Sequence, residues 1–233
     1  MSFSFEVVIP SRYGASRLPG KPLLEIGGNT LIQHVYKSAC NSQADGVIIA
    51  TDDERIEDLA RSFGAEVIMT SREHTSGTDR ITEVIERKNY QDDVIVVNVQ
   101  GDEYGLPSEL IDQVASALND NPDKLMATLC EKIEQLEDSN NPNMVKVVRD
   151  KNNTALYFSR STIPWQEKGK KLKGNVSPVY RHIGIYAYRA GFLKQFSKLP
   201  VCPLEETEKL EQLRAIYNGY SIHVEEACTE SGI

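Results

Sequence analysis

The chain has 233 residues, and 34 acidic against 26 basic side chains give it a formal net charge of −8 at pH 7. This balance argues against a nucleic-acid or anionic-membrane partner, because both need a basic protein face. The length and the 40% share of hydrophobic residues predict one compact domain, and no apolar run approaches the ~18 residues of a membrane span, so we expect a cytoplasmic protein.

Short apolar runs alternate with amphipathic segments through the first half of the chain. This order predicts an α/β fold with a Rossmann-like, doubly wound and mostly parallel sheet. Ligands bind such a sheet beyond the carboxyl ends of its strands, and polar clusters follow three of the expected strands. The strands are expected at 5–10, 46–53, 65–70 and 93–102, the helices at 31–40, 55–64 and 78–88, and the polar clusters at 11–12, 51–53 and 98–103.

The second half follows a different pattern, which predicts a mixed sheet. Strand-like runs lie at 124–133, 143–150 and 155–165, and a strand turns into a helix over 182–196. One helix is expected over 202–219, with Leu204, Leu210, Leu213 and Ile216 toward the core and Gly219 past its end. The lysine-rich stretch 166–178 predicts an exposed loop, with a lid as the alternative.

The four cysteines lie far apart and include no C-x-x-C pair. Such spacing argues against a zinc site or a redox dithiol. We therefore expect reduced core residues at Cys40, Cys130, Cys202 and Cys228.

The loop after the first expected strand gathers three cations in an acidic protein. Residues 9–23 contain Arg12, Arg17 and Lys21 together with two glycines. Backbone N–H groups and cations on such a loop can bind a polyphosphate. The loop matches neither a P-loop nor a dinucleotide fingerprint. The residues alone leave two interpretations open, a phosphate-binding loop and a solvated loop whose arginines pair with surface acids.

Two more clusters lie at the expected sheet edge. Asp102, beside Glu103, could bind Mg²⁺ against the phosphates of a nucleotide, because Mg²⁺ usually takes one or two carboxylates plus phosphate oxygens. The alternative is an acidic turn or a helix cap. Ser76, Gly77 and Thr78 begin an expected helix, with Thr78 as its N-cap or with these small groups against a base or ribose.

The second half supplies candidate residues for an acceptor substrate. An arginine can bind a carboxylate through two hydrogen bonds, but a lone arginine is more often part of a surface ion pair. A histidine on a half-buried strand is more often a structural hydrogen-bonding group than a base, and an acidic helix face is usually only solvated. The candidates are Arg160, Arg181, His182, Tyr186, Glu205, Glu208, Glu211 and Gln212.

Eight motifs occur together in one order over nearly the whole chain: IPSRYGASRLPGKPL, ATDD, SGTDR, NVQGDE, NPNMVKVV, ALYFSRSTIPW, RHIGIYAYRAGF and PLEETEKLEQLR. In this order they resemble the cytidylyltransferases that activate 3-deoxy-manno-octulosonic acid (Kdo), the CMP-Kdo synthetases of Gram-negative bacteria. The resemblance implies a fold of the nucleotide-diphospho-sugar transferase type. It also implies attack of the sugar's anomeric hydroxyl on the α-phosphate of CTP, with release of pyrophosphate, for lipopolysaccharide biosynthesis.

The resemblance further implies a role for each matching residue. It implies one domain over 1–233, with a nucleotide-binding half at 1–122 and a sugar-binding half at 123–233 through which the family forms homodimers. Mg²⁺ is the implied cofactor, and no covalent nucleophile is needed. The implied roles are Arg12, Arg17 and Lys21 for the triphosphate; Ser16, Ser76, Gly77 and Thr78 for the nucleotide; Gln100 between nucleotide and sugar; Asp102 for Mg²⁺; Arg160 for the sugar carboxylate; His182, Tyr186, Glu211 and Gln212 for its hydroxyls; and catalytic roles for Arg12, Lys21 and Asp102.

The chain departs from the family pattern at two places. The family usually has QGDEP, whereas Tyr104 and Gly105 follow Glu103 here, and this loosens the backbone beside the expected metal site. The family continues past the last residues of this chain with an Asp-Thr motif whose Asp is a second metal ligand, so we expect that the sequence is truncated. An 8-amino analogue of Kdo is a further candidate substrate, because Glu211 could favour its ammonium group.

Two alternatives to a Kdo cytidylyltransferase stay open. The first is a nucleotidyltransferase for another acidic sugar or another nucleoside triphosphate, in which Gln100 and the SGTDR segment would face a different base. The second is a catalytically silent protein that binds CTP, which the missing second Asp would explain. A comparison of the four nucleoside triphosphates separates the first alternative from the family's reaction, and binding without turnover identifies the second.

Overall fold

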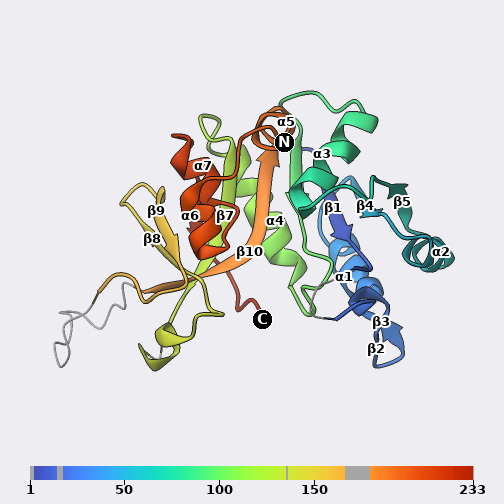
Figure 1. Ribbon diagram of the computed structural model, residues 1–233, viewed down its shortest axis with the longest axis horizontal. Coiled ribbons are helices and arrows are strands. Elements are labelled where there is room, and N and C mark those ends of the chain that lie inside the picture. The colour runs from blue at the N-terminus through green and yellow to red at the C-terminus, as the bar shows by residue number, and fades with distance from the viewer. Residues whose placement is uncertain (1–2, 15–17, 135, 166–178, 233) are drawn as a thin grey trace.

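A computed structural model describes residues 3–14, 18–134, 136–165 and 179–232 of the protein (Figure 1). A nine-stranded sheet has the strand order β11-β7-β10-β6-β1-β4-β5, and β8 pairs with both β10 and β9. The strands are β1 (Phe5–Ser11), β4 (Gly46–Thr51), β5 (Glu66–Met69), β6 (Ile95–Asn98), β7 (Met126–Lys132), β8 (Lys146–Arg149), β9 (Ala155–Ser159), β10 (Tyr180–Arg189) and β11 (His223–Glu226), and β2 (Glu25–Ile26) and β3 (Asn29–Thr30) form a separate hairpin.

The first half of the chain forms the parallel part of this sheet, as predicted. Strand β1 pairs in parallel with β4 and with β6, and β4 pairs in parallel with β5. Successive side chains of a strand point to opposite faces. Val7 and Ile9 pack into the core on one face and Val8 into the core on the other, and all three are fully buried. Such a strand needs helices on both faces.

Seven helices cover the sheet in the described ranges. Apolar residues of α1, α2 and α4 fill the core on one face, while those of α3, α5 and α7 fill the core on the other, so the predicted doubly wound arrangement is confirmed. The helices are α1 (Leu31–Cys40), α2 (Glu54–Ser62), α3 (Gly77–Arg87), α4 (Ser108–Asn119), α5 (Ala190–Phe196), α6 (Pro203–Glu208) and α7 (Leu213–Tyr217), with short 3₁₀ turns η1 (Lys21–Leu23) and η2 (Leu136–Asn140).

The second half forms a mixed sheet, as predicted, with antiparallel pairs around β10 and a parallel pair of β11 with β7. Strand β10 pairs antiparallel with β6 on one side and with β7 and β8 on the other. The register between β10 and β7 shifts between Ile183 and Tyr186, which marks a bulge. Figure 1 shows the long β10 ribbon crossing the middle of the molecule, where it joins the two halves.

The prediction of one helix over 202–219 is wrong, because the chain breaks it into α6 and α7. The break falls at Lys209, whose φ of 54° lies in the left-handed region. Leu210 and Leu213 follow this residue and are buried, so the turn serves to bring both side chains to the core. Gly219 has a φ of 83° directly after α7, as the predicted C-cap requires.

The cysteine prediction is half correct. All four cysteines are free, with Cys130 and Cys202 buried, but Cys40 and Cys228 are exposed. No helix in the described ranges is long and apolar enough to span a membrane. The predicted loop at 166–178 lies outside the described residues.

Candidate active site

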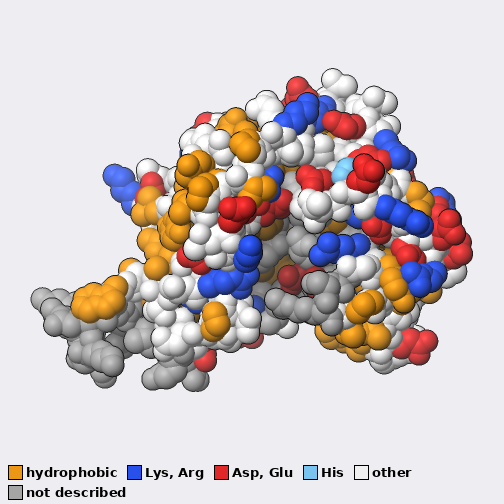
Figure 2. Space-filling model, in the orientation of Figure 1, with side chains coloured by type: hydrophobic (Ala, Val, Ile, Leu, Met, Phe, Trp, Pro, Cys, Tyr) orange, Lys and Arg blue, Asp and Glu red, His pale blue; other side chains and the backbone are white. Residues whose placement is uncertain are grey.

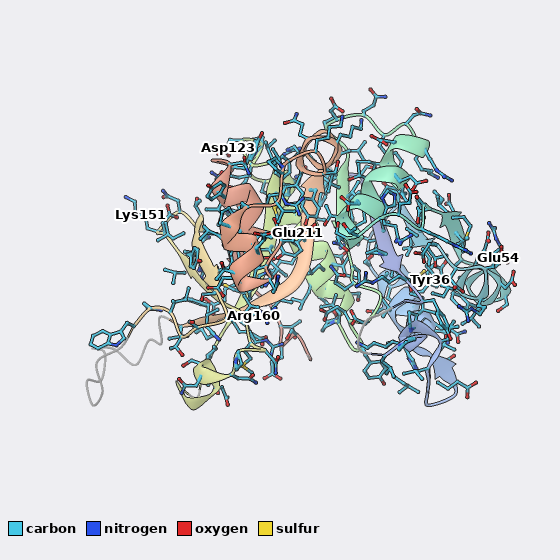
Figure 3. All side chains as sticks on the ribbon, viewed as in Figure 1. Tyr36, Glu54, Asp123, Lys151, Arg160 and Glu211 are labelled. Atoms are coloured by element: carbon cyan, nitrogen blue, oxygen red, sulfur yellow. The ribbon has the colours of Figure 1, made fainter. Side chains whose placement is uncertain are left out.

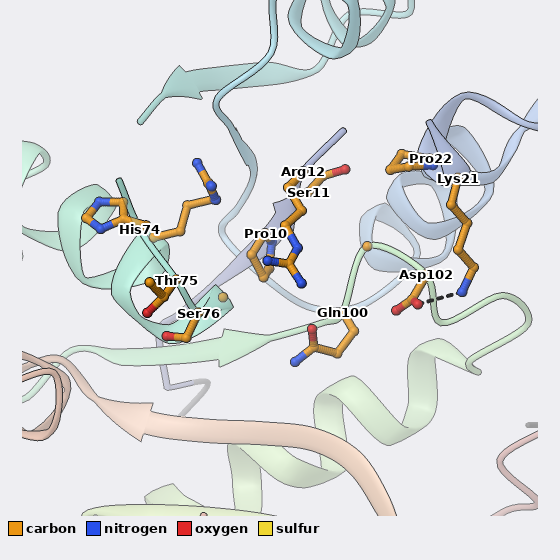
Figure 4. Close-up of a pocket in the computed structure, with 13 residues that line it drawn as sticks. Pro10, Ser11, Arg12, Lys21, Pro22, His74, Thr75, Ser76, Gln100 and Asp102 are labelled. Carbon is orange, nitrogen blue, oxygen red and sulfur yellow. Dashed lines mark hydrogen bonds and ion pairs between the residues drawn. The ribbon is translucent and has the colours of Figure 1, made fainter. Parts of the chain in front are cut away.

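A hollow of about 270 Å³ lies at the carboxyl ends of β1 and β6, beside the first turn of α3 (Figure 4). This is the sheet edge at which the sequence predicts ligand binding. Polar and charged side chains dominate its lining, and they come from four separate stretches of the chain. The lining residues are Pro10, Ser11, Arg12, Lys21, Pro22, His74, Thr75, Ser76, Gly77, Arg80, Gln100, Gly101 and Asp102.

Most of the nucleotide-side residues predicted from the sequence meet in this hollow. Figure 4 shows Arg12 and Gln100 between the start of α3 on one side and the Lys21–Asp102 pair on the other. Two parts of the prediction, Ser16 and Arg17, lie outside the described residues.

Lys21 and Asp102 form a direct ion pair. The Lys21 Nζ lies 2.5 Å from the Asp102 Oδ2, and the side chains are 37% and 53% exposed. An exposed pair of this kind contributes little to stability. Both groups therefore remain accessible to a charged ligand, Lys21 to an anion and Asp102 to a cation.

The first turn of α3 presents its N-terminus to the hollow. The Ser76 Oγ accepts a hydrogen bond from the Asp79 N–H at 3.0 Å, and the Asp79 carboxylate accepts one from the Ser76 N–H at 3.3 Å. This capping box shows that the prediction of Thr78 as the N-cap is wrong, since Ser76 takes that place. A Cβ on Gly77 would lie 3.2 Å from Pro10 Cγ, so a glycine lets α3 approach β1 closely.

Three polar residues of this hollow were not named individually in the sequence predictions, although Arg80 belongs to the SGTDR segment. Arg80 is 2% exposed, and its Nη2 donates to the Asp52 Oδ2 at 2.9 Å, which ties α3 to the end of β4. The His74 ring nitrogen Nε2 lies 2.6 Å from a Glu83 carboxylate oxygen. Thr75 completes the set. The sequence places Asp52 in a polar cluster at a strand end, which is a signal for a functional residue. Its pairing with Arg80 of α3 can be recognised only in the folded structure.

The loop that departs from the family pattern has a backbone that requires glycine. Gly105 has a φ of 85°, a conformation that side chains with a Cβ rarely adopt. Tyr104 is 49% exposed, and its ring meets the His34 ring edge-on at 5.1 Å. The Tyr104 side chain therefore packs against α1.

His182 and Tyr186 lie on β10, next to its bulge. The His182 Nε2 is 3.0 Å from the Thr128 Oγ1, and the ring packs between Phe158 and Tyr186. Burial, with a smaller contribution from Arg181, lowers the pKa of His182 to about 3, so this ring is neutral at pH 7. It can exchange hydrogen bonds with a ligand but is a poor base.

His182 lines a second hollow, of about 390 Å³, together with Glu103, Arg181 and the turn at 143–145. The Glu103 carboxylate lies against Gly184 in the β10 bulge. Its Oε1 is 3.3 Å from the position that a Cβ would take if residue 184 had a side chain. Burial and the neighbouring Asp102 raise the pKa of Glu103. The two adjacent carboxylates thus face different hollows.

Among the residues that the structure describes, backbone carbonyls and not a surface acid hold the Arg160 guanidinium. Its guanidinium donates to the oxygens of Glu208 at 2.7 Å, Pro142 at 3.0 Å and Lys209 at 3.4 Å. Figure 3 shows Arg160 below the α6 and α7 helices, with Glu211 above it. The expectation of a solvated acidic face on the last helix is wrong, because Glu205 pairs with Arg214 and Glu208 binds the Arg160 N–H and the Ser159 hydroxyl.

Glu211 connects the two halves of the chain. Its Oε2 accepts a hydrogen bond from the Thr78 Oγ1 at 2.5 Å, which draws the Thr78 hydroxyl away from the first hollow. Burial raises the pKa of Glu211 despite the Thr78 bond and Arg214. The adjacent Gln212 is 6% exposed. The predicted acceptor residues Arg160, Tyr186, Glu211 and Gln212 line neither of the two hollows.

The donor set fits Mg²⁺ only in combination with a phosphate ligand. No group of three or more His, Cys, Asp or Glu residues that could hold a metal occurs within the described ranges. Asp102, an exposed carboxylate at the rim of the first hollow, suits an ion that takes one protein carboxylate and completes its shell with phosphate oxygens and water.

Comparisons with known proteins identify the family. Residues 7–223 match the family model described as cytidylyltransferase. The chain belongs to the cytidylyltransferase family. A 3-deoxy-manno-octulosonate cytidylyltransferase of Francisella tularensis subsp. novicida is 50% identical to this cytidylyltransferase over 99% of its chain and 93% of the relative's own. One of Nitrosococcus oceani is 51% identical over 95% of this chain and 87% of its own.

Solved structures agree with this assignment. A CMP:2-keto-3-deoxy-manno-octonic acid synthetase complexed with CTP superposes on this cytidylyltransferase with a TM-score of 0.89, at 41% identity over 99% of this chain and 93% of the other. A 4-diphosphocytidyl-2C-methyl-D-erythritol synthase has a TM-score of 0.63 at 11% identity, which shows a shared fold. The expected nucleotidyltransferase fold and enzyme class are thereby confirmed.

Proposed function

We propose that this cytidylyltransferase transfers CMP from CTP to Kdo, forming CMP-Kdo and pyrophosphate. The observation that carries the proposal is the conjunction of a cationic hollow at the carboxyl ends of β1 and β6 with full-length similarity to proteins named for that reaction. Except for Thr78, the proposed site residues keep the roles that the family resemblance implies.

The nucleotide binds in the first hollow in this proposal. Arg12 and Lys21 offset the charge of the triphosphate, and the N-terminus of α3 adds its unpaired N–H groups and its dipole. Ser76 and Gly77, at the start of α3, would contact the nucleoside, and Gln100 would lie between nucleoside and sugar. Thr78 contributes indirectly, by holding Glu211.

The acceptor sugar approaches from the second half. Arg160 receives its carboxylate, and His182, Tyr186, Glu211 and Gln212 bind its hydroxyls. The anomeric hydroxyl oxygen attacks the α-phosphorus and releases its proton to solvent, a new P–O bond forms, the bond to the bridging oxygen of the β-phosphate breaks, and pyrophosphate leaves. The protein supplies position and charge, which is the usual form of catalysis in phosphoryl and nucleotidyl transfer.

Asp102 would hold Mg²⁺ at the triphosphate. When bound, the ion offsets charge that develops on the phosphate oxygens. The Lys21 ammonium would then exchange its Asp102 partner for a phosphate oxygen, so the ion pair keeps both groups in place before the substrate arrives.

We further infer that the enzyme is a homodimer that acts in the cytoplasm, where CTP is available, to supply lipopolysaccharide biosynthesis. The support for a dimer is a group of exposed apolar side chains in the second half, and Figure 2 shows apolar side chains gathered on the side of β9, α6 and α7. The most exposed of them are Leu156 (56%), Trp165 (81%), Val201 (56%) and Tyr217 (57%).

Pyrophosphate release tests the proposed function. The protein is incubated with Mg²⁺ and each of the four nucleoside triphosphates, with Kdo and with its 8-amino analogue in parallel. Release with CTP and either sugar is expected, and the ratio of the two rates identifies the preferred sugar. Release with another triphosphate would assign a different nucleotide, and CTP binding without any release would support the silent binder instead.

A further inference from the structure

Lys146 carries a buried positive charge that the proposed reaction does not use. Its side chain is fully buried at the start of β8. The Nζ donates to three backbone carbonyls, those of Asn141 at 3.0 Å, Met144, and Arg160 at 2.6 Å. An ammonium has three protons to donate, so these bonds use all of them.

The three carbonyls belong to two segments of the acceptor side. Asn141 and Met144 belong to one turn. Asn143, Met144 and Val145 of this turn form one wall of the second hollow. The third carbonyl is that of Arg160, the proposed carboxylate-binding residue. Lys146 therefore ties the wall of the hollow to the segment that presents Arg160.

Arg160 closes the same network from the other side. Its guanidinium binds the Pro142 carbonyl of that turn and the Glu208 and Lys209 carbonyls at the α6–α7 break. The Arg160 N–H also donates to the Glu208 carboxylate at 2.9 Å. The turn, the end of β9 and the break that precedes Glu211 are thus held together by two cations.

Within the described part of the chain, no carboxylate forms an ion pair with Lys146. The charged groups that act on its ammonium are Glu208 and Arg160, of opposite sign. Two cations sharing one carboxylate leave a net positive charge beside the proposed carboxylate site. A buried charge without its own counter-ion is unfavourable for folding, and the three carbonyl bonds offset that cost. The lysine therefore fixes the two segments that supply these carbonyls.

We propose that Lys146 is a positioning residue for the acceptor sugar, which sets the Arg160 backbone and the 141–144 turn and adds positive potential toward the sugar's carboxylate. This inference rests on the proposed function. Small displacements of a positioned group can change rates about 100-fold, so loss of the ammonium acts on the acceptor step.

The test compares steady-state constants of Lys146→Met with those of the wild type. The KM for Kdo is expected to rise about tenfold or more, while the KM for CTP changes less than about threefold, because only the acceptor side loses its support. Lys194→Met is the matched control, since the Lys194 Nζ donates to the Tyr90 carbonyl at 3.0 Å and to Asp92, away from both hollows. It should leave both constants unchanged. Lys146→Arg should recover part of the Kdo affinity.

A merely structural lysine would give a different result. Lowered thermal stability with an unchanged KM for Kdo, or equal increases of both KM values, would overturn the proposal. If Lys146→Met does not fold, hydrogen exchange of the wild type tests whether the segments joined by Lys146 respond to the acceptor sugar. Kdo should slow exchange in 143–149 and 159–161 together, CTP alone should not, and no protection by Kdo would overturn the proposal. Failure of the proposed function shows separately, as absence of pyrophosphate release by the wild type with Kdo.

Discussion

The ion pair of Lys21 with Asp102 joins two groups that a nucleotide and its metal would separate. The pair is short, at 2.5 Å, and about half exposed, so breaking it costs little. Each partner holds the other in a position from which it can turn to a ligand of opposite charge. A carboxylate alone at this place would repel the triphosphate, and the lysine offsets that repulsion.

Asp102→Asn should separate the metal role of this residue from its pairing with Lys21. The amide still accepts a hydrogen bond from the ammonium but is a poor ligand for Mg²⁺, so kcat is expected to fall about 100-fold or more, with a higher Mg²⁺ concentration needed for half-maximal rate. Pyrophosphate release against Mg²⁺ concentration measures both. Asp58→Asn, at an exposed position of α2, should change neither, and an active Asp102→Asn enzyme with unchanged Mg²⁺ dependence would contradict the assignment.

His182 predicts an acid-sensitive stability. Its folded pKa of about 3 lies below the ordinary value of 6.5, so the unfolded chain takes up a proton between these pH values and the folded chain does not. The stabilisation is full above pH 6.5 and is lost as the pH falls toward 3. Between pH 7 and pH 5 the free energy of unfolding of the wild type should fall by about 1–2 kcal/mol more than that of His182→Gln.

Urea unfolding at several pH values measures this difference. Thr128→Val is the matched control, because it removes the hydroxyl that binds His182 and keeps the titrating ring. It should be less stable at every pH while its pH dependence follows the wild type. Parallel curves for His182→Gln and the wild type would show that another group is responsible.

At the scale of the element, the capping box of α3 carries two functions that substitution can separate. The Ser76 hydroxyl caps the helix and also faces the proposed nucleotide site. Ser76→Ala should lower the free energy of unfolding by about 1 kcal/mol. Ser76→Asp keeps the cap but adds a negative charge, so it should retain stability and raise the KM for CTP. Equal CTP affinity of the wild type and Ser76→Asp would place the nucleotide elsewhere.

The α6–α7 break predicts a stabilising substitution. Lys209 has a φ of 54°, and a residue with a Cβ pays about 1 kcal/mol in this conformation relative to glycine. Lys209→Gly should therefore raise the free energy of unfolding by up to about 1 kcal/mol. Lys209→Ala removes the same charge but keeps the Cβ, so it should bring no gain. A stabilised Lys209→Ala would attribute the effect to charge instead of the backbone.

The elements that the sequence predicts well are those whose signals are local. Strand β1 is recognisable because Val7, Val8 and Ile9 are apolar on both faces, and α1 lies at its predicted residues. The α6–α7 break was missed because Leu210 and Leu213 also fit an unbroken helix, and only their packing against the sheet selects the turn. The bond of Thr78 to Glu211 spans 133 positions and carries no local signal at all.

At the scale of the whole molecule, the candidate site combines what two halves of the chain contribute. The first half supplies the cationic hollow at the ends of parallel strands, where the sequence predicts it. The second half supplies the proposed acceptor residues, which the family resemblance names but which periodicity does not. Arg160 shows why, since its partners are carbonyls of two distant segments and any residue type can provide a carbonyl.

The proposed dimer is the prediction that belongs to the whole molecule. Trp165 is 81% exposed and Leu156 is 56% exposed, and large apolar side chains of this kind are typical anchors of protein interfaces. A Leu156→Asp/Trp165→Asp variant should dissociate into monomers at protein concentrations where the wild type is dimeric, because two unpaired carboxylates would have to be buried.

Light scattering coupled to gel filtration measures the two masses, and Leu24→Asp is the control. Leu24 is 45% exposed and lies in the first half, so its substitution changes an apolar side chain in the same way without affecting an interface built by the second half. Circular dichroism shows whether each variant keeps its fold. If the double variant is still a dimer, the β9 side is not part of the interface. If the wild type is a monomer, the proposed dimer is wrong. If only Leu24→Asp is a monomer, the interface lies in the first half.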